Sequence, residues 1–171
     1  DEIEVLNWQR TLSNAAGGPY IGICWRSGKV TGGRALNFAP LEIWGAFIRD
    51  MPGTPVCVQY DATDDEIEKL CALSGNTIVV PGGIDQKNEL DRACALMSAL
   101  DAVVSAPTAV SWLSAGAGVP TFKIQRDAGW TSFGCDHEPF APAALGIVPD
   151  VSGDWADSLG KALAALNSQF G

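Results

Sequence analysis

Ser105-Ala-Pro-Thr-Ala-Val-Ser-Trp-Leu-Ser-Ala-Gly-Ala-Gly-Val-Pro120 is the most informative stretch of this chain. It follows the apolar, β-branched run 102–105, which is typical of a strand inside a parallel sheet, and it predicts a helix of small residues from Thr108. The free backbone N–H groups at a helix N-terminus favour an anion, and Pro107 and Ala109 leave room for one to approach. The junction therefore predicts a phosphate site or an ordinary strand-to-helix turn, and both interpretations stay open.

Short apolar strands alternate with amphipathic helices along most of the chain. Strands are expected at residues 20–25, 54–60, 77–80, 101–105, 121–124 and 146–148. Helices are expected at residues 1–13, 40–50, 63–74, 87–100 and 108–116 and from about residue 154, with a loop at 125–144. This alternation implies right-handed crossovers and an α/β fold, a Rossmann-like doubly wound parallel sheet covered on both faces.

One domain accounts for most of the sequence, because 171 residues that are 47% hydrophobic can bury one sizeable core. We expect residues 1–19 to form a leading helix and linker, and residues 20–171 to form the Rossmann-like domain. Leu90, Cys94, Met97 and Trp112 are expected to face the core. Since the chain begins with Asp1 instead of Met, we expect a fragment, with a trimmed or processed terminus as the alternative.

Charge and cysteine content exclude several classes of protein. The formal net charge of −9 repels nucleic acid and anionic membrane surfaces, and no apolar run is long enough to span a membrane. The five cysteines are odd in number and lack metal-ligand spacing, which favours reduced core thiols and a cytoplasmic protein. No carboxylate pair stands in a suitable loop for a metal, since Asp64 and Asp65 belong to a helix cap.

A candidate binding site follows from the fold, because doubly wound sheets bind ligands beyond the carboxyl ends of their strands. That rule brings together residues 26–39, residues 59–62 with 81–86, and residues 106–110. The first of these loops carries Arg26, Lys29 and Arg34, a local basic cluster in an acidic chain. Arginine binds a diphosphate with two parallel hydrogen bonds, so Arg26 and Arg34 are stronger candidates than Lys29.

Several motifs together resemble a known family. They are Ile21-Gly-Ile-Cys-Trp-Arg-Ser-Gly28, Arg34-Ala-Leu-Asn-Phe-Ala-Pro-Leu41, Val58-Gln59, Leu100-Asp-Ala-Val-Val-Ser105 and the stretch quoted first. In order and spacing they resemble the C-terminal half of a GT-B glycosyltransferase over about residues 20–168. The likeness is closest to bacterial tetratricopeptide-linked enzymes related to the protein O-GlcNAc transferase and the heptosyltransferases.

The resemblance implies a donor-binding domain that moves a sugar from a nucleotide diphosphate sugar to a protein or glycan acceptor. Residues 20–171 would then be the nucleotide-sugar-binding domain. An N-terminal GT-B half, and possibly tetratricopeptide repeats, would lie elsewhere in a longer chain. No metal or other cofactor is implied, and the isolated half is expected to be weakly active or inactive.

The resemblance also implies roles for individual residues. Arg26, Ser27 and Arg34 would approach the diphosphate, Gln59 the base or ribose, and Pro107, Thr108 and Ala109 would lie under the diphosphate. Four residues are weaker candidates. Lys29 could simply be solvated, and Asp85 could meet a ribose or cap the next helix. Trp130 could line the pocket, and His137, the only histidine, could be catalytic or simply solvated.

The chain departs from the family pattern at two positions. Relatives often have an Asp-Thr pair and a histidine five residues after that aspartate, where this chain has Pro107 and Trp112. Backbone amides at residues 108–110 can bind phosphate without those side chains. These departures leave open a non-catalytic nucleotide-binding or interaction module of the same fold. A Rossmann oxidoreductase is disfavoured because no GxGxxG motif follows the first strand.

Overall fold

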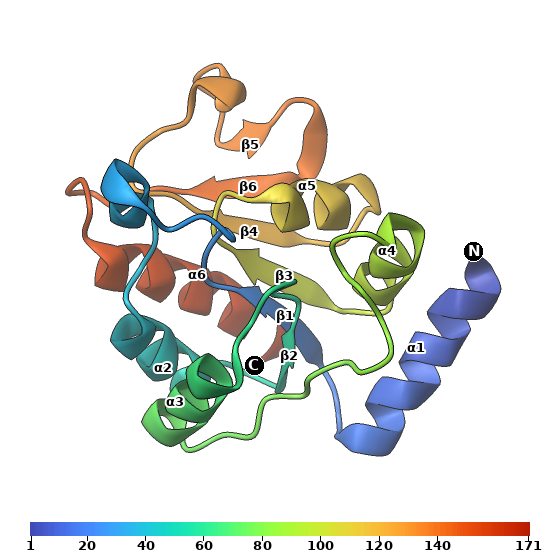
Figure 1. The fold of residues 1–171 in the computed structure, drawn as a ribbon. Helices are drawn as coiled ribbons and strands as arrows, with labels where there is room; N and C mark the ends of the chain where they lie inside the picture. The colour runs from blue at the N-terminus through green and yellow to red at the C-terminus, as the bar shows by residue number, and fades with distance from the viewer.

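The central sheet has six strands in the order β2-β1-β3-β4-β6-β5 in a computed structural model that describes residues 1–171 (Figure 1). The strands are β1 (Tyr20–Cys24), β2 (Thr54–Cys57), β3 (Ala102–Ser105), β4 (Thr121–Ile124), β5 (His137–Glu138) and β6 (Ala141–Ile147). Neighbouring strands run parallel except β5, which pairs antiparallel with β6. The predicted doubly wound α/β fold is confirmed.

Helices cover both faces of this sheet (Figure 1). They are α1 (Glu2–Ala15), α2 (Leu41–Asp50), α3 (Asp64–Ser74), α4 (Leu90–Ser98), α5 (Ala109–Gly116) and α6 (Trp155–Phe170), with 3-10 turns η1 (Gly32–Asn37) and η2 (Trp130–Ser132). Helices α2, α3 and α6 pack on one face, and α1, α4 and α5 on the other. No helix combines the length and the apolar character needed to cross a lipid bilayer.

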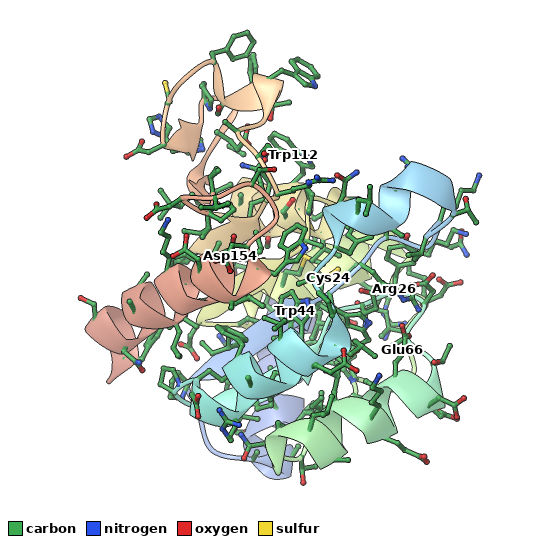
Figure 2. The ribbon with its side chains drawn as sticks, turned by 90° about the vertical axis from the view of Figure 1, so that its left-hand side faces the viewer. Cys24, Arg26, Trp44, Glu66, Trp112 and Asp154 are labelled. Atoms are coloured by element: carbon green, nitrogen blue, oxygen red, sulfur yellow. The ribbon has the colours of Figure 1, made fainter.

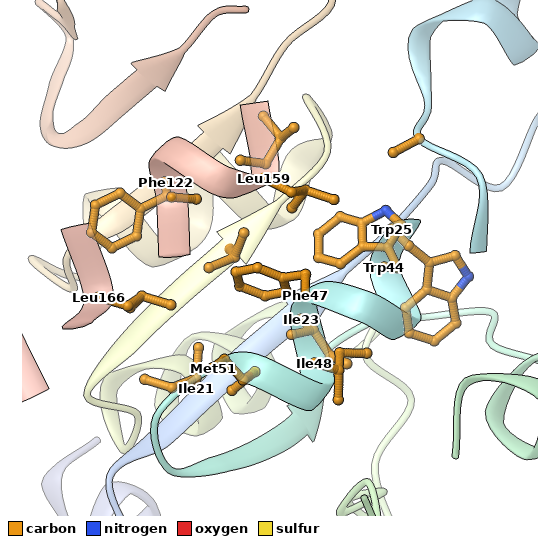
Figure 3. Packing of buried hydrophobic residues seen from close by; sticks show 14 of the residues in the cluster. Ile21, Ile23, Trp25, Trp44, Phe47, Ile48, Met51, Phe122, Leu159 and Leu166 are labelled. Atoms are coloured by element: carbon orange, nitrogen blue, oxygen red, sulfur yellow. The ribbon is translucent and has the colours of Figure 1, made fainter. Parts of the chain in front are cut away.

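The larger core cluster lies between the sheet and helices α2, α3 and α6 (Figure 3). Ile21 and Ile23 of β1 point into it, and Trp44 contacts Phe47 edge to face with ring centroids 5.7 Å apart. Gly22 lies on the opposite face of β1, where an added Cβ would stand 2.8 Å from Leu100 Cδ1. A glycine at this position therefore allows the segment after α4 to pack closely on the sheet.

Local sequence sets several helix ends. The predicted capping box at the start of α3 is present: Thr63 Oγ1 accepts from Glu66 N, and the Glu66 carboxylate accepts from Thr63 N. Asp154 caps α6 by accepting from Asp157 N at 3.1 Å. The leading helix α1 packs on α4 through the buried side chains of Trp8 and Leu12.

Two expected elements at the β2 edge differ from the prediction. Residues 77–80 form only an isolated bridge between Val79 and Val56, because Pro81 has no N–H to extend the ladder. The helix expected at 87–100 begins at Leu90, since Asp85 Oδ1 accepts from Lys87 N and ties residues 85–88 into a turn. As the first residue of α4, Leu90 is exposed instead of facing the core.

The segment 125–144 is more ordered than the expected loop. It contains η2 and β5, and β6 already begins at Ala141 instead of residue 146. The alanine-rich start of β6 lacks the β-branched residues that mark a strand in sequence, and pairing with β4 and β5 makes it one. Trp112 is also not a core residue, because its side chain is 36% exposed and its ring lies against Lys123.

Candidate functional site

The carboxyl ends of β1 and β3 form the point where the sheet topology reverses. The chain leaves β1 toward β2 on one side and leaves β3 toward β4 on the other. Ser27 follows β1, and Pro107 follows β3, so both residues lie at this reversal. Doubly wound sheets bind ligands at such a point, because the diverging connections leave a crevice between them.

Two adjoining cavities occupy this crevice and share Ser27, Arg34 and Pro107; we call them together the cleft. The polar cavity, of about 230 Å³, is lined by Ser27, Arg34, Asn37, Phe38, Pro107, Gln125, Arg126 and Asp127. The mixed cavity, of about 390 Å³, is lined by Ser27, Arg34, Tyr60, Gln86, Lys87, Leu90, Met97, Pro107, Thr108, Ala109, Val110 and Leu113. The cleft therefore offers a polar end and a half-apolar end, with a basic residue common to both.

The N-terminus of α5 faces the mixed cavity. Thr108 is its N-cap, and the Thr108 Oγ1 accepts from Val110 N at 3.3 Å. The first turn carries no acidic side chain, so nothing on the helix itself neutralises its positive end. Pro107, Thr108 and Ala109 all line the cleft, and the strand-to-helix junction thus lies where the sequence analysis expected it.

The three basic residues of the first loop lie in different surroundings. Arg34 is exposed in η1, lines both cavities and takes part in none of the ion pairs of the chain. Lys29 is exposed and lies outside both linings, and its backbone N–H donates to Ser27 Oγ at 3.2 Å. Arg26 also lies outside both linings, because its guanidinium pairs with Asp61 at 2.9 Å and with Glu66 at 2.5 Å.

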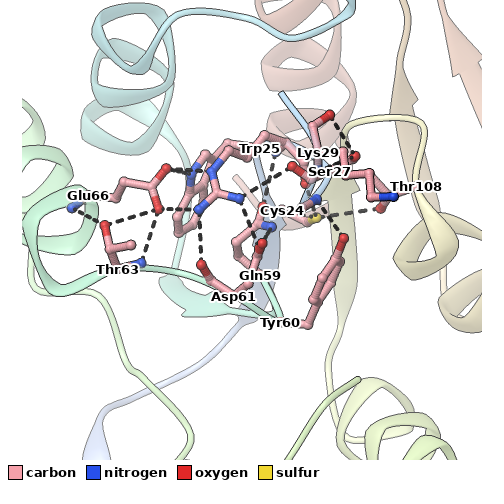
Figure 4. A network of polar contacts seen from close by, with 12 residues as sticks. Cys24, Trp25, Ser27, Lys29, Gln59, Tyr60, Asp61, Thr63, Glu66 and Thr108 are labelled. Atoms are coloured by element: carbon pink, nitrogen blue, oxygen red, sulfur yellow. Dashed lines mark hydrogen bonds and ion pairs between the residues drawn. The ribbon is translucent and has the colours of Figure 1, made fainter. Parts of the chain in front are cut away.

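Gln59 lies beneath the cleft instead of lining it. Its side chain is buried, and Oε1 accepts from Arg26 N at 3.0 Å while Nε2 donates to Asp61 Oδ1 at 2.7 Å (Figure 4). The Cys24 thiol, 3.4 Å from Gln59 Oε1, also lies 3.6 Å from Thr108 Oγ1. Gln59 is therefore part of a hydrogen-bonded layer that supports the floor of the cleft.

The weaker sequence candidates lie away from both cavity linings. Asp85 accepts from Asn88 N at 3.1 Å and from Lys87 N, so it closes a turn. Trp130 is 82% exposed and packs edge to face on Phe133 at 6.4 Å. His137 is exposed on β5, with Nδ1 2.8 Å from Asp136 Oδ1.

The structure adds cleft residues that the sequence analysis did not name. Arg126 and Asp127 follow β4, and Arg126 Nε is buried without a hydrogen-bond partner, 3.6 Å from Asp127 Oδ2. On the other side, Tyr60 and Gln86, which belong to the loops expected at the site, line the mixed cavity together with Lys87, and Gln86 Oε1 is also buried without a partner. The rule that ligands lie beyond strand ends would have found Arg126, because that rule applies to the loop after residue 124 as well.

Burial and ion pairing fix the protonation states around the cleft. Burial raises the pKa of the Cys24 thiol to about 11, so this group is neutral at pH 7. Burial alone would raise the pKa of Glu66, but hydrogen bonds from Arg26 and Thr63 lower it to about 2. Hydrogen bonding to Glu66 raises the pKa of Arg26 above its usual range. The Arg26–Glu66 pair is therefore ionised at neutral pH.

The sequence is similar over nearly its whole length to one part of a longer bacterial protein. No protein-family model matches the sequence. The chain is 30% identical over 166 residues to Protein FlbA of Caulobacter vibrioides, covering 97% of this chain and 28% of that protein. It therefore spans little more than a quarter of FlbA.

Solved structures with the same fold include heptosyltransferases and a family 9 glycosyl transferase. E. coli heptosyltransferase WaaC with ADP-2-deoxy-2-fluoro heptose has a TM-score of 0.55 and 18% identity, covering 95% of this chain and 46% of WaaC. E. coli ADP-heptose LPS heptosyltransferase II has a TM-score of 0.62 and 14% identity, with coverages of 98% and 53%. A family 9 glycosyl transferase from Veillonella parvula has a TM-score of 0.60 and 11% identity, covering 99% of this chain and 52% of its own. The chain spans about half of each structure and has the Rossmann-like fold of one half of a GT-B glycosyltransferase.

Proposed function

We propose that the chain is the donor-binding half of a glycosyltransferase and that its cleft holds the nucleotide diphosphate of a nucleotide-sugar donor. The observation that carries the proposal is the position of Arg34. It is an unpaired arginine in a chain of net charge −9, and it lines both cavities beside the N-terminus of α5. A guanidinium and a helix N-terminus directed at one cleft are suited to bind a dianionic diphosphate.

The two ends of the cleft suit different parts of such a donor. We assign the base and ribose to the mixed cavity, where Tyr60 and Leu113 offer apolar contact and Gln86 Oε1 offers a free acceptor. We assign the glycosyl unit to the polar cavity, which Arg126 and Asp127 line. The structural neighbour WaaC was solved with ADP and with an ADP-heptose analogue, which supports a donor of this general class.

The proposed chemistry is transfer of the sugar to a hydroxyl of a protein or glycan acceptor. As the bond between sugar and diphosphate breaks, negative charge grows on the departing nucleotide diphosphate. Arg34, Arg126 and the amides at the start of α5 would stabilise this charge by electrostatic preorganisation. We further propose that a longer parent chain supplies the N-terminal GT-B half, together with any tetratricopeptide repeats, and that the acceptor is a protein or a glycan. All five cysteines are free, in keeping with a reducing compartment, and we place the protein in the cytoplasm.

A second candidate function is a nucleotide-binding or interaction module without transfer activity. One observation favours it: the two cavity linings hold a single carboxylate, Asp127, and no histidine. Trp112, at the position where relatives often have histidine, packs on Lys123 with the ammonium 5.0 Å from the ring centroid. If the chain does belong to an active transferase, a base for the acceptor hydroxyl would have to come from Asp127 or from the other half of the enzyme.

Calorimetric titration of the purified chain with UDP, GDP, CDP, ADP and NAD tests the proposal. Selective binding of one nucleoside diphosphate is the expected result, and it would identify the base. Absence of binding to all four diphosphates, or preference for NAD, would contradict the proposal. Sugar-transfer assays on the full-length parent protein then separate the enzyme from the non-catalytic module, because only the enzyme turns the donor over.

A further inference from the structure

Arg26 is the centre of a polar network that connects helix α3 with the segments that follow β1, β2 and β3 (Figure 4). Its Nε donates to Glu66 Oε1 at 2.5 Å, and its Nη2 donates to Glu66 Oε2 at 2.6 Å and to the Asp61 carbonyl at 3.0 Å. Its Nη1 donates to Asp61 Oδ1 at 2.9 Å and to the Ser27 carbonyl at 3.3 Å. A guanidinium has five N–H groups, and these five contacts leave none free for a ligand.

Glu66 and Asp61 are themselves held in place. Glu66 belongs to the capping box of α3, and its Oε1 also accepts from Trp25 Nε1 at 3.2 Å. Asp61 Oδ1 accepts from Gln59 Nε2 at 2.7 Å. Figure 2 shows Arg26 and Glu66 side by side. An incoming phosphate would have to displace two anchored carboxylates to reach Arg26.

The network also reaches the parts of the cleft that do face a ligand. Arg26 N donates to Gln59 Oε1, and Cys24 links Gln59 with the Thr108 hydroxyl at the N-cap of α5. Two residues after Arg26, Gly28 N donates to the Tyr60 hydroxyl at 2.6 Å. A Cβ on Gly28 would lie 2.8 Å from that hydroxyl and 2.8 Å from Asp61 Oδ2, so a larger residue would require both side chains to shift. Ser27 is held between these two attachments.

We propose that Arg26 is a positioning residue: its ion pairs with Glu66 and Asp61 hold Ser27 and the start of α5 at the spacing that an anionic ligand requires. Arg34 and Arg126 are then the arginines that contact the ligand. The effect on ligand affinity rests on the proposed function. The effect on the order of residues 26–30 and of the start of α5 is a property of the ligand-free chain and does not depend on any ligand.

Glu66→Gln separates positioning from direct contact, because only the positioning role predicts a loss of ligand affinity. Glutamine keeps the capping-box acceptor but removes the charge that holds Arg26. If Arg26 positions the loop, affinity for the nucleoside diphosphate bound by the wild-type chain falls roughly tenfold. If Arg26 were a phosphate ligand, removing its competing carboxylate would leave affinity unchanged or raise it, and that result would overturn the proposal.

Matched controls exclude general effects of charge and stability. Glu42→Gln removes an equal charge from an exposed ion pair with Lys69, outside both cavity linings, and should leave affinity unchanged. Ile21→Val weakens core packing at the opposite end of β1 and should lower the melting temperature without lowering affinity. If Glu66→Gln gives an unfolded protein, Asp61→Asn serves instead. That substitution removes the charge of the other carboxylate that pairs with Arg26, and Asp61 is more exposed than Glu66.

Hydrogen exchange in the ligand-free chain provides the second readout. In Glu66→Gln, the backbone amides of residues 26–30 and 108–110 should exchange at least several-fold faster than in wild type, and the Trp25 indole N–H resonance should shift. Exchange at wild-type rates in both segments would overturn the proposal. If the wild-type chain binds no nucleoside diphosphate, the proposed function fails, and exchange alone decides the role of Arg26.

Discussion

Lys123 of β4 and Glu138 of β5 form an ion pair whose side chains are only 4% and 1% exposed. Glu138 Oε1 also accepts from Thr131 Oγ1 at 3.2 Å, and the Trp112 ring lies 5.0 Å from the Lys123 ammonium. Burial lowers the pKa of Lys123 below its ordinary value. These contacts fasten η2 and β5 to the sheet beside the polar cavity.

Removing one member of this pair should destabilise the fold strongly. Lys123→Met leaves the Glu138 carboxylate buried and uncompensated, which costs about 3–5 kcal/mol of unfolding free energy. The double variant Lys123→Met/Glu138→Leu has no buried charge and should recover most of that loss. Urea denaturation at pH 7 measures both values. Equal losses in the single and double variants would show that packing, and not the unpaired charge, sets the cost.

Arg34→Ala should weaken binding of the nucleoside diphosphate by about ten- to a hundredfold, the range for a lost hydrogen bond to a charged group. Its melting temperature should hardly change, because Arg34 is exposed and unpaired in the free chain. Calorimetry and a thermal melt provide the two measurements. Arg10→Ala, an exposed arginine on α1, is the matched control for loss of one positive charge. Equal affinities in both variants would remove Arg34 from the site.

The contribution of Glu66 to stability should depend on pH. Its pKa falls from 4.5 in the unfolded chain to about 2 in the folded chain, chiefly through Arg26. A lowered carboxyl pKa stabilises the fold above the unfolded value, and that contribution is lost as the pH falls from about 4.5 toward 2. Wild type should exceed Glu66→Gln by about 2 kcal/mol at pH 7 and by much less near pH 2. A difference independent of pH would contradict the assigned ion pair.

Two helical glycines should respond in opposite ways to alanine. At Gly45 of α2 an added Cβ would lie 2.4 Å from Leu73 Cβ, so Gly45→Ala should cost about 1–3 kcal/mol through overpacking against α3. At Gly160 of α6 nothing lies within 4 Å, so Gly160→Ala should stabilise by about 0.5–1 kcal/mol. Chemical denaturation of both variants tests the packing of α2 on α3. Stabilisation by Gly45→Ala would contradict the close packing of α2 on α3, and destabilisation by Gly160→Ala would contradict the open space beside Gly160 on α6.

Elements with strong local signals were predicted correctly. The capping box at Thr63 and the apolar strand before Ser105 form as expected, because short-range hydrogen bonds and burial on both faces of the sheet specify them. Elements with weak local signals were predicted incorrectly. Residues 77–80 have strand composition but lie at an edge with one bridge, and Ala141–Ile147 becomes a strand through pairing with its neighbours.

The amino-acid sequence alone determined the class of fold and the position of the cleft, since strand periodicity and the rule for strand ends depend only on local pattern. It placed Arg34 and the start of α5 at the cleft for the same reason. Only the tertiary structure decided which arginine is free. Arg26 and Arg34 look alike in a sequence, but Glu66, forty residues away, occupies the guanidinium of Arg26 and leaves that of Arg34 unpaired. Contacts between distant parts of the chain thus assign roles that residue type and spacing cannot distinguish.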